Sequence, residues 1–426
     1  MFTRLIDSLA ATEALSQIFS DGVVLQAMLD FEAGLARAEA RAGVIPPNAA
    51  QAISDAAVAE GFDSSELVRE SLRAGTPAIP LVRMLTERVD TRNKAAAGFV
   101  HWGATSQDVT DTALVLLLGQ CRHVLEAGHH RILGGLHRIS NEHANTPMLG
   151  RTLLQPAPPI TFGLKAAGWL GAIRRGWSRV ASRFDEADFV QFGGATGTLA
   201  ALGDRGIAVS EALAEELKLK CPDAPWHGYR DRLAALMAAL SIYTASLGKM
   251  ALDIALLMQF EVSEAFEPGG SGRGGSSTMP HKRNPTACML AISAAKRSPG
   301  LLSAFMNGMM VEHERAIGGW QAEWATVQAI VQTTGVAVEA MAEVAEGLVV
   351  DVERMRRNIE STAGVVFAEK AMMTLAREMG RDAARREVEE SIRNTGSPPE
   401  LPGLLEPEGY LGSAESFRLR LLDGKE

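Results

Sequence analysis

The feature that most constrains the fold is a long apolar segment without a polar face. Residues Arg230 to Ala265 are predicted to form one helix whose apolar side chains fall on all sides, at Leu233, Leu236, Met237, Leu240, Tyr243, Leu247, Met250, Ile254, Leu257 and Met258. A helix of this kind belongs inside a bundle or at a subunit interface. Its longest uncharged stretch, Leu233 to Gly248, is too short and too rich in Ala and Ser for a membrane span. Other long helices must therefore cover it.

The rest of the chain supplies such helices. Asp108 to Ala144 is far longer than an average helix of about 11–12 residues, and the acidic residues at its start suit the positive end of the helix dipole. Asp21 to Ala42 has apolar residues at helical spacing. Further helices are predicted over Asn48 to Glu60, Ile79 to Val89, Pro159 to Phe184, Pro285 to Gly308 and Trp320 to Val349. Few alternating strand patterns compete, so the prediction is an all-α fold.

The length of 426 residues favours two or three domains. We expect an N-terminal helical domain over residues 1–109 and a central long-helix bundle over residues 110–350. After Val350 the predicted helices shorten and the charge rises, which indicates a small C-terminal helical domain over residues 351–426.

Charge and cysteine content exclude several classes of function. The formal net charge of -9 argues against nucleic acid and anionic membranes as partners, although one site can still bind an anion. The widely spaced Cys121, Cys221 and Cys288 are typical of reduced thiols in a cytoplasmic protein. Neither C-x-x-C nor H-E-x-x-H occurs, so no metal site is expected. No charged-then-apolar signal pattern precedes the first helix.

A glycine-rich segment over residues 269–285 carries the most specific functional signal. Five glycines within seven residues are followed by paired serines and then by Met-Pro-His-Lys-Arg-Asn-Pro. Glycines allow close approach to a ligand, and Lys282 and Arg283 supply positive charge for an anion. Gly270, Gly272 and Gly275 also fit G-x-G-x-x-G, but an apolar helix precedes them instead of a strand, which argues against dinucleotide binding.

Two other segments carry polar groups before long helices. In His101 to Thr112, hydroxyls and N–H groups precede a helix, an arrangement that receives anions; equally, Thr105 or Ser106 could only cap that helix. Gly150 to Pro156 is predicted to be a polar loop that enters another helix. Glu312 to Trp320 is a further candidate, although such a segment is more commonly a solvated turn. Gly193 to Thr198 is read as a loop connecting helices.

The segments at residues 101–112, 150–156 and 269–285 resemble, in order, the three signature regions of the fumarase/aspartase superfamily. The resemblance covers roughly Asp21 to Trp324. It implies all-helical homotetramers with a twenty-helix core and active sites that each draw on three subunits. The implied reaction is reversible elimination or addition β to a carboxylate, with no metal and no organic cofactor.

The resemblance also assigns candidate site residues. Ser276 matches the serine that exchanges the proton on the α-carbon. A serine hydroxyl needs nearby positive charge or N–H donors for this role, and preorganised donors stabilise the negative charge that develops on the substrate. The residues expected to bind substrate are His101, Thr105, Ser106, Arg151, Gln155, Ser277, His281, Lys282, Asn284 and Arg315, with the roles of His101 and His281 left open.

Two departures indicate a branch of the superfamily. Adenylosuccinate lyases carry histidine in the second region and in a Thr-Arg-His pattern before the first, where this chain has Leu153 and Asn93. An imidazole can protonate a leaving amine, whereas leucine cannot. The loss suits the lactone-forming branch, in which a carboxylate of a small tricarboxylate adds within the same molecule. An adenylosuccinate-type lyase and a non-catalytic protein of the same fold stay open as alternatives.

Overall fold

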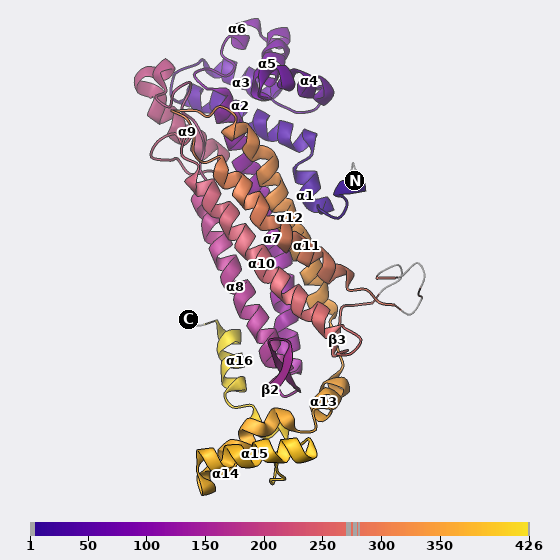
Figure 1. The fold of residues 1–426 in the computed structure, drawn as a ribbon. Coiled ribbons are helices and arrows are strands. Elements are labelled where there is room, and N and C mark those ends of the chain that lie inside the picture. The colour runs from indigo at the N-terminus through magenta and orange to yellow at the C-terminus, as the bar shows by residue number, and fades with distance from the viewer. Residues whose placement is uncertain (1–4, 270–273, 276–278, 280–281, 425–426) are drawn as a thin grey trace. The chain divides into compact units, whose positions relative to one another are not determined.

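The computed structural model describes residues 5–269, 274–275, 279 and 282–424, and its regular structure is almost all helical (Figure 1). The predicted all-α fold is confirmed. The helices are α1 (Glu13–Ile18), α2 (Asp21–Arg41), α3 (Pro47–Ala56), α4 (Ser64–Ala74), α5 (Ala78–Arg92), α6 (Lys94–Ala97), α7 (Ser106–Glu142), α8 (Phe162–Ala187), α9 (Gly206–Leu217), α10 (Asp231–Leu257), α11 (Thr286–Asn307), α12 (Gly319–Gly347), α13 (Val352–Glu360), α14 (Ala368–Met379), α15 (Arg381–Thr395) and α16 (Ala414–Asp423).

The remaining elements are short. Within the described ranges, four 3-10 helices cover Leu5–Asp7, Ala200–Arg205, Val365–Phe367 and Pro407–Tyr410. The same ranges hold two antiparallel pairs of strands, which join β1 (Pro147–Thr152) to β2 (Gln155–Thr161) and β3 (Ala265–Phe266) to β4 (Val349–Val350).

The described chain divides into two compact units. Unit 1 contains residues 1–127, 177–245 and 294–336, and unit 2 contains residues 128–176, 246–293 and 337–426. The long helices α7, α8, α10, α11 and α12 contribute residues to both units. The division into three domains at residues 109 and 350 stays a prediction.

In unit 1, contacts between side chains hold the long helices against one another. The hydroxyls of Thr244 and Thr334 lie 2.9 Å apart and join α10 to α12. Trp177 of α8 packs on Tyr243 of α10 with ring centroids 5.7 Å apart. At the N-terminal end, α2 packs against α3 and α9, and Phe31 of α2 contacts Phe192. The core of this unit is therefore built between helices.

Helix α10 is a core helix. Among the described residues it is the one helix long and apolar enough to cross a membrane, yet 67% of its most apolar window is buried inside the protein. Leu236, Leu240, Tyr243 and Leu247 are fully buried. The prediction that this apolar helix belongs inside a bundle is confirmed.

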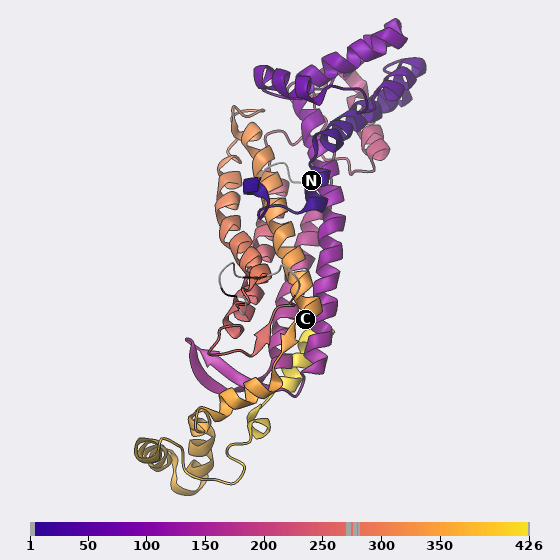
Figure 2. The ribbon, with the colours of Figure 1, turned by 90° about the vertical axis from the view of Figure 1, so that its right-hand side faces the viewer.

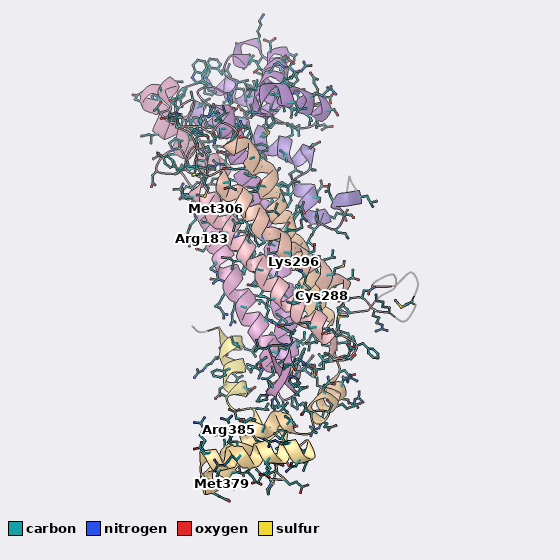
Figure 3. All side chains as sticks on the ribbon, in the orientation of Figure 1. Arg183, Cys288, Lys296, Met306, Met379 and Arg385 are labelled. Carbon is teal, nitrogen blue, oxygen red and sulfur yellow. The ribbon has the colours of Figure 1, made fainter. Side chains whose placement is uncertain are left out.

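In unit 2, the same long helices are joined by polar contacts. Arg131 of α7 binds Glu339 and Glu346 of α12, and the Trp169 indole of α8 donates to Asp253 of α10 at 2.8 Å. Helix α13 packs against β1, as Figure 2 shows. Helices α14 and α15, which carry Met379 and Arg385 in Figure 3, form a small core with β1 and α13. Its buried members are Leu149, Ile359, Val366, Phe367, Ala371, Val388 and Leu404.

Several predicted boundaries differ from the structure: the helix predicted over Asn48 to Glu60 ends at Ala56, and two larger differences follow. The helix predicted over Arg230 to Ala265 ends at Leu257, and the chain then turns and passes through a left-handed residue at Ser263 (φ 53°). The N–H of Glu264 then bonds back to the Leu257 carbonyl at 3.0 Å. This turn leads into β3 and directs the chain after it to pair with β4.

The loop predicted over Gly150 to Pro156 is a β-hairpin, and Pro159 lies in β2 instead of starting a helix. Prolines are normally disfavoured in strands because they lack an N–H, but they are tolerated where a strand has a free edge. A two-stranded hairpin offers such edges on both strands. Helix α8 therefore begins only at Phe162.

Candidate active site

The start of α7 presents hydroxyl groups that are not used to cap the helix. Thr105 is the residue before the helix, and its backbone N–H donates to the Asp108 carboxylate at 3.0 Å. Its hydroxyl accepts a hydrogen bond from Arg315 Nη1 at 2.6 Å. The capping contact at this end of the helix is therefore made by Asp108, and the Thr105 hydroxyl belongs to a different contact.

Arg315 brings the first region together with the segment between α11 and α12. Besides Thr105, its guanidinium donates to the Ser106 hydroxyl at 3.3 Å and to the Gln107 side-chain oxygen at 3.4 Å. Arg315, Thr105 and Ser106 are half-buried. Three predicted substrate-binding residues thus form one cluster in unit 1, which we call the arginine–hydroxyl cluster. It combines a cation, two hydroxyls and a helix N-terminus, the groups that receive carboxylates.

A buried carboxylate fixes the position of this cluster. Asp108 is fully buried and accepts from the backbone N–H groups of Gly193 and Gly194 at 3.0 Å each, and from His227 Nε2 at 2.7 Å. Gly194 has a positive φ of 67°, and a side chain there would meet the Gly103 carbonyl at 2.8 Å. The loop at residues 193–198 is therefore part of the support of the site.

A second buried network lies one turn further along α7. Arg230 donates two hydrogen bonds to Asp111, at 2.7 and 3.0 Å, and also binds Glu323 at 2.6 Å. All three side chains are buried. Burial raises the pKa of Glu323, although Arg230 opposes this shift. Burial would lower the pKa of Arg230, but Asp111 and Glu323 outweigh it and raise that pKa. The network ties α7 and α12 to the residue that directly precedes α10.

His101, whose role the sequence left open, is bound to a carboxylate that sequence reasoning missed. Its Nδ1 lies 2.7 Å from Glu32 Oε1 of α2. Burial lowers the pKa of His101, but Glu32 and Asp108 outweigh burial and raise it. His101 has a left-handed backbone with a φ of 59°, which is uncommon for a residue with a side chain.

The second region lies in unit 2, on the β1–β2 hairpin. Both terminal nitrogens of Arg151 bind the fully buried Glu264 carboxylate, at 2.7 and 2.8 Å. This bidentate pair anchors the end of β1. Gln155 is exposed at the start of β2. Between them, Leu153 and Leu154 form the turn with φ values of 51° and 65° and are 96% and 79% exposed.

The third region is described only in part. Ser276, Ser277 and His281 lie outside the described residues. Lys282 is exposed, and the Asn284 N–H bonds to the Gly274 carbonyl at 2.9 Å, within unit 2. Within the described ranges, no group of three His, Cys, Asp or Glu side chains could hold a metal ion.

Of the residues that hold the site in position, only Asp108 had a signal in the sequence. Thr105-x-x-Asp108 has the spacing of a capping box, in which the third helical residue bonds back to the cap; this spacing could have identified Asp108. Nothing local marks Glu32, His227 or Glu264, because their partners lie 69, 119 and 113 positions away.

An all-α fold of long helices with an arginine–hydroxyl cluster at a helix N-terminus and a Gly-Ser-Ser segment defines a lyase-type enzyme of the fumarase/aspartase superfamily. The family described as "Lyase" matches residues 9–300. The chain belongs to this family, as its motifs predicted.

Named relatives extend over nearly the whole chain. The 3-carboxy-cis,cis-muconate cycloisomerase of Bradyrhizobium diazoefficiens is 42% identical, over 99% of this chain and 98% of the relative. That of Pseudomonas aeruginosa is 44% identical, over 98% and 96%. The crystal structure of the 3-carboxy-cis,cis-muconate lactonizing enzyme from Pseudomonas putida matches with a TM-score of 0.94 and 44% identity, over 99% of this chain and 98% of that one.

Proposed function

We propose that the chain is a 3-carboxy-cis,cis-muconate cycloisomerase, which converts this tricarboxylate to 4-carboxymuconolactone in the protocatechuate branch of the β-ketoadipate pathway. We place it in the cytoplasm, in line with its reduced cysteines. The observation that carries the proposal is the arginine–hydroxyl cluster, where Arg315 binds Thr105 and Ser106 at the start of α7. The likeness to named cycloisomerases supports the same activity.

Substrate binding requires positive charge and donors, because the substrate carries three carboxylates. Arg315 supplies a permanent cation, and the Thr105 and Ser106 hydroxyls accept from it while keeping their own hydrogens for a ligand. Lys282, Asn284 and Gln155 are assigned to the remaining carboxylates. Each ion pair gains strength once water is excluded from the site.

The chemical step is an intramolecular addition. One carboxylate oxygen of the substrate forms a bond to the alkene carbon β to another carboxylate, and the electron pair of the double bond moves toward that second carboxylate. Ser276 then gives a proton to the α-carbon and regains one from solvent, so that the tricarboxylate and one proton give the dicarboxylate lactone. Holding both groups in one molecule supplies a large part of the rate.

The hairpin supports a cycloisomerase over an amine-releasing lyase. The turn residue Leu153 stands where adenylosuccinate lyases carry histidine, and it bears no proton to give. In the reverse reaction of a lactone the leaving group is a carboxylate, a stable anion that needs little protonation. Arg151 is held by Glu264 in a contact within the hairpin's own unit, and its assignment to substrate stays a prediction.

We also propose that the enzyme is a homotetramer whose active sites are shared between three subunits. Exposed apolar side chains on the long helices suit a subunit interface. They include Ile242 and Leu252 on α10 and Met289 and Met306 on α11, the last of which is labelled in Figure 3. Light scattering of the purified protein tests this assembly, because a monomer near 45 kDa would contradict it.

An absorbance assay tests the activity. Purified protein is given 3-carboxy-cis,cis-muconate or adenylosuccinate in separate cuvettes. Loss of the diene absorbance in the first cuvette alone is the expected result. Turnover of adenylosuccinate alone would assign the chain to the amine-releasing lyases. Saturable binding without turnover of either compound, or no binding at all, would contradict the proposed enzyme.

A further inference from the structure

A buried carboxylate on α2 contacts His101 of the first signature region. Glu32 is 1% exposed, and its Oε1 lies 2.7 Å from His101 Nδ1. Because a carboxylate only accepts, Nδ1 carries a hydrogen and donates it to Glu32. No described residue bonds to the other ring nitrogen, Nε2, and the His101 side chain is 18% exposed. The ring therefore has one end fixed in the protein and the other end left for a ligand.

Two negative groups face His101 from two different helices. Glu32 approaches from α2, and Asp108 of α7 adds its negative charge. Asp108 is shared with His227 and with backbone N–H groups, whereas Glu32 has no other described partner and its Oε2 is unbonded. The charge of Glu32 is therefore compensated chiefly by His101.

A second buried carboxyl on α2, that of Glu39, has its pKa raised by its surroundings. Glu39 lies two turns after Glu32 on the same side of the helix, is fully buried, and has no partner for either oxygen. Burial, helped by the charge of Glu32, raises the pKa of Glu39 to about 9. Glu39 is therefore neutral near pH 7, and the interaction with α2 that raises the pKa of His101 is the one with Glu32.

We infer that Glu32 is a positioning residue that orients the His101 ring through Nδ1 and keeps it as an imidazolium, so that Nε2–H donates to a substrate carboxylate. The inference deepens the proposed function and rests on it for the identity of that carboxylate. The left-handed backbone of His101, with a φ of 59°, is consistent with a ring held in a required place.

The substitution Glu32→Gln tests the inference, because it keeps the shape and one acceptor oxygen but removes the charge. Without the charge, burial lowers the pKa of His101, so the imidazolium is lost at a lower pH. The alkaline limb of the pH profile of kcat/KM should move to lower pH by about one unit. At pH values above that limb, kcat/KM should therefore fall by up to tenfold. The loss should appear in KM and be reversed when the pH is lowered. Glu39→Gln is the matched control and should leave the limb in place.

A measurement on the free protein separates this inference from the proposed function. The His101 Cε1–H signal is followed with pH in protein carrying ¹³C-labelled histidine, and it is assigned by its loss in His101→Asn. We expect a midpoint above the ordinary value of about 6.5 in the wild type and a lower one in Glu32→Gln. Equal midpoints in the two proteins would overturn the inference, as would a shifted midpoint with an unmoved kcat/KM profile. Should Glu32→Gln fail to fold, a wild-type midpoint below the ordinary value overturns it alone.

This titration does not depend on catalysis. A chain that turned over no tricarboxylate but showed the expected two midpoints would contradict the proposed function and support the Glu32–His101 coupling. A chain that turned over 3-carboxy-cis,cis-muconate with equal midpoints would support the function and overturn the coupling.

Discussion

Arg315 Nη1 donates a hydrogen bond to Thr105 Oγ1 across 2.6 Å, although 210 positions separate the two residues in the chain. The contact sets the direction of the threonine hydroxyl. Because its oxygen accepts from the arginine, its hydrogen is left to donate elsewhere. A cation and a correctly directed hydroxyl are thus held together before any ligand arrives, which is what preorganised binding of a carboxylate requires.

Replacing Arg315 should weaken substrate binding far more than it weakens the fold. Arg315→Lys keeps the charge but loses the fork that reaches Thr105 and Ser106 together. We expect kcat/KM for 3-carboxy-cis,cis-muconate to fall by about 100-fold, or roughly 2.7 kcal/mol. Arg122→Ala is a suitable control, because the ion pair of Arg122 is with the exposed Asp185 and its other described contact is the Phe184 ring. If Arg315→Lys were as active as the control variant, Arg315 would not be a substrate-binding residue.

Arg230→Met should destabilise the protein strongly. It leaves the buried carboxylates of Asp111 and Glu323 without their cation, and removing one partner of such a pair costs about 3–5 kcal/mol. Thermal unfolding followed by circular dichroism measures the effect. The triple variant Arg230→Met, Asp111→Asn, Glu323→Gln should recover part of the loss, because it removes the uncompensated charges. A single variant as stable as the wild type would show that the network contributes little.

Glu39→Gln should stabilise the protein at alkaline pH. The pKa of Glu39 is about 9 in the folded protein and near 4.5 when unfolded, so ionisation favours the unfolded chain between these values. Wild-type stability therefore falls as the pH rises from 4.5 toward 9, by at most about 1.4 kcal/mol per pH unit from this group. The glutamine lacks this dependence. Melting temperatures at pH 5.5 and 8.5 should show a larger gain for the variant at pH 8.5, and an equal gain at both would contradict the assignment.

The strained leucines of the hairpin turn should lower stability but support activity. Leu153 and Leu154 hold positive φ values that suit Asn-Gly in a two-residue turn, and each leucine costs about 1–2 kcal/mol there. Strain of this kind is retained at functional positions. We expect Leu153→Asn with Leu154→Gly to keep the secondary structure and lower kcat/KM by more than about tenfold, or 1.4 kcal/mol. Full activity in the double variant would show that the leucines do not serve the site.

The helices were predictable from the sequence because their signals are local. The apolar character of α10 on all sides and the length of α7 both follow from the residue pattern of each segment alone. The β1–β2 hairpin was missed because its turn residues are leucines, where a turn of this type usually carries Asn or Gly. The proline-rich β2 also lacks the β-branched residues that mark strands.

The motif residues of the site were predictable from the sequence, but the residues that hold them in position were not. The gathering of Thr105, Ser106 and Arg315 follows the family pattern, and the structure brings these residues together. The contacts of Glu32 with His101 and of Arg151 with Glu264 depend on the tertiary fold, which no local spacing reveals. The assignment of individual residues to substrate stays a prediction.

Identification of the product tests the central claim most directly. Purified protein is incubated with 3-carboxy-cis,cis-muconate in D₂O, and the product is followed by ¹H NMR. The proposed mechanism predicts 4-carboxymuconolactone carrying one deuterium on the carbon that Ser276 protonates, and no lactone above background with Ser276→Ala. An unchanged substrate spectrum with the wild-type protein, or lactone formed equally fast by Ser276→Ala, would contradict it.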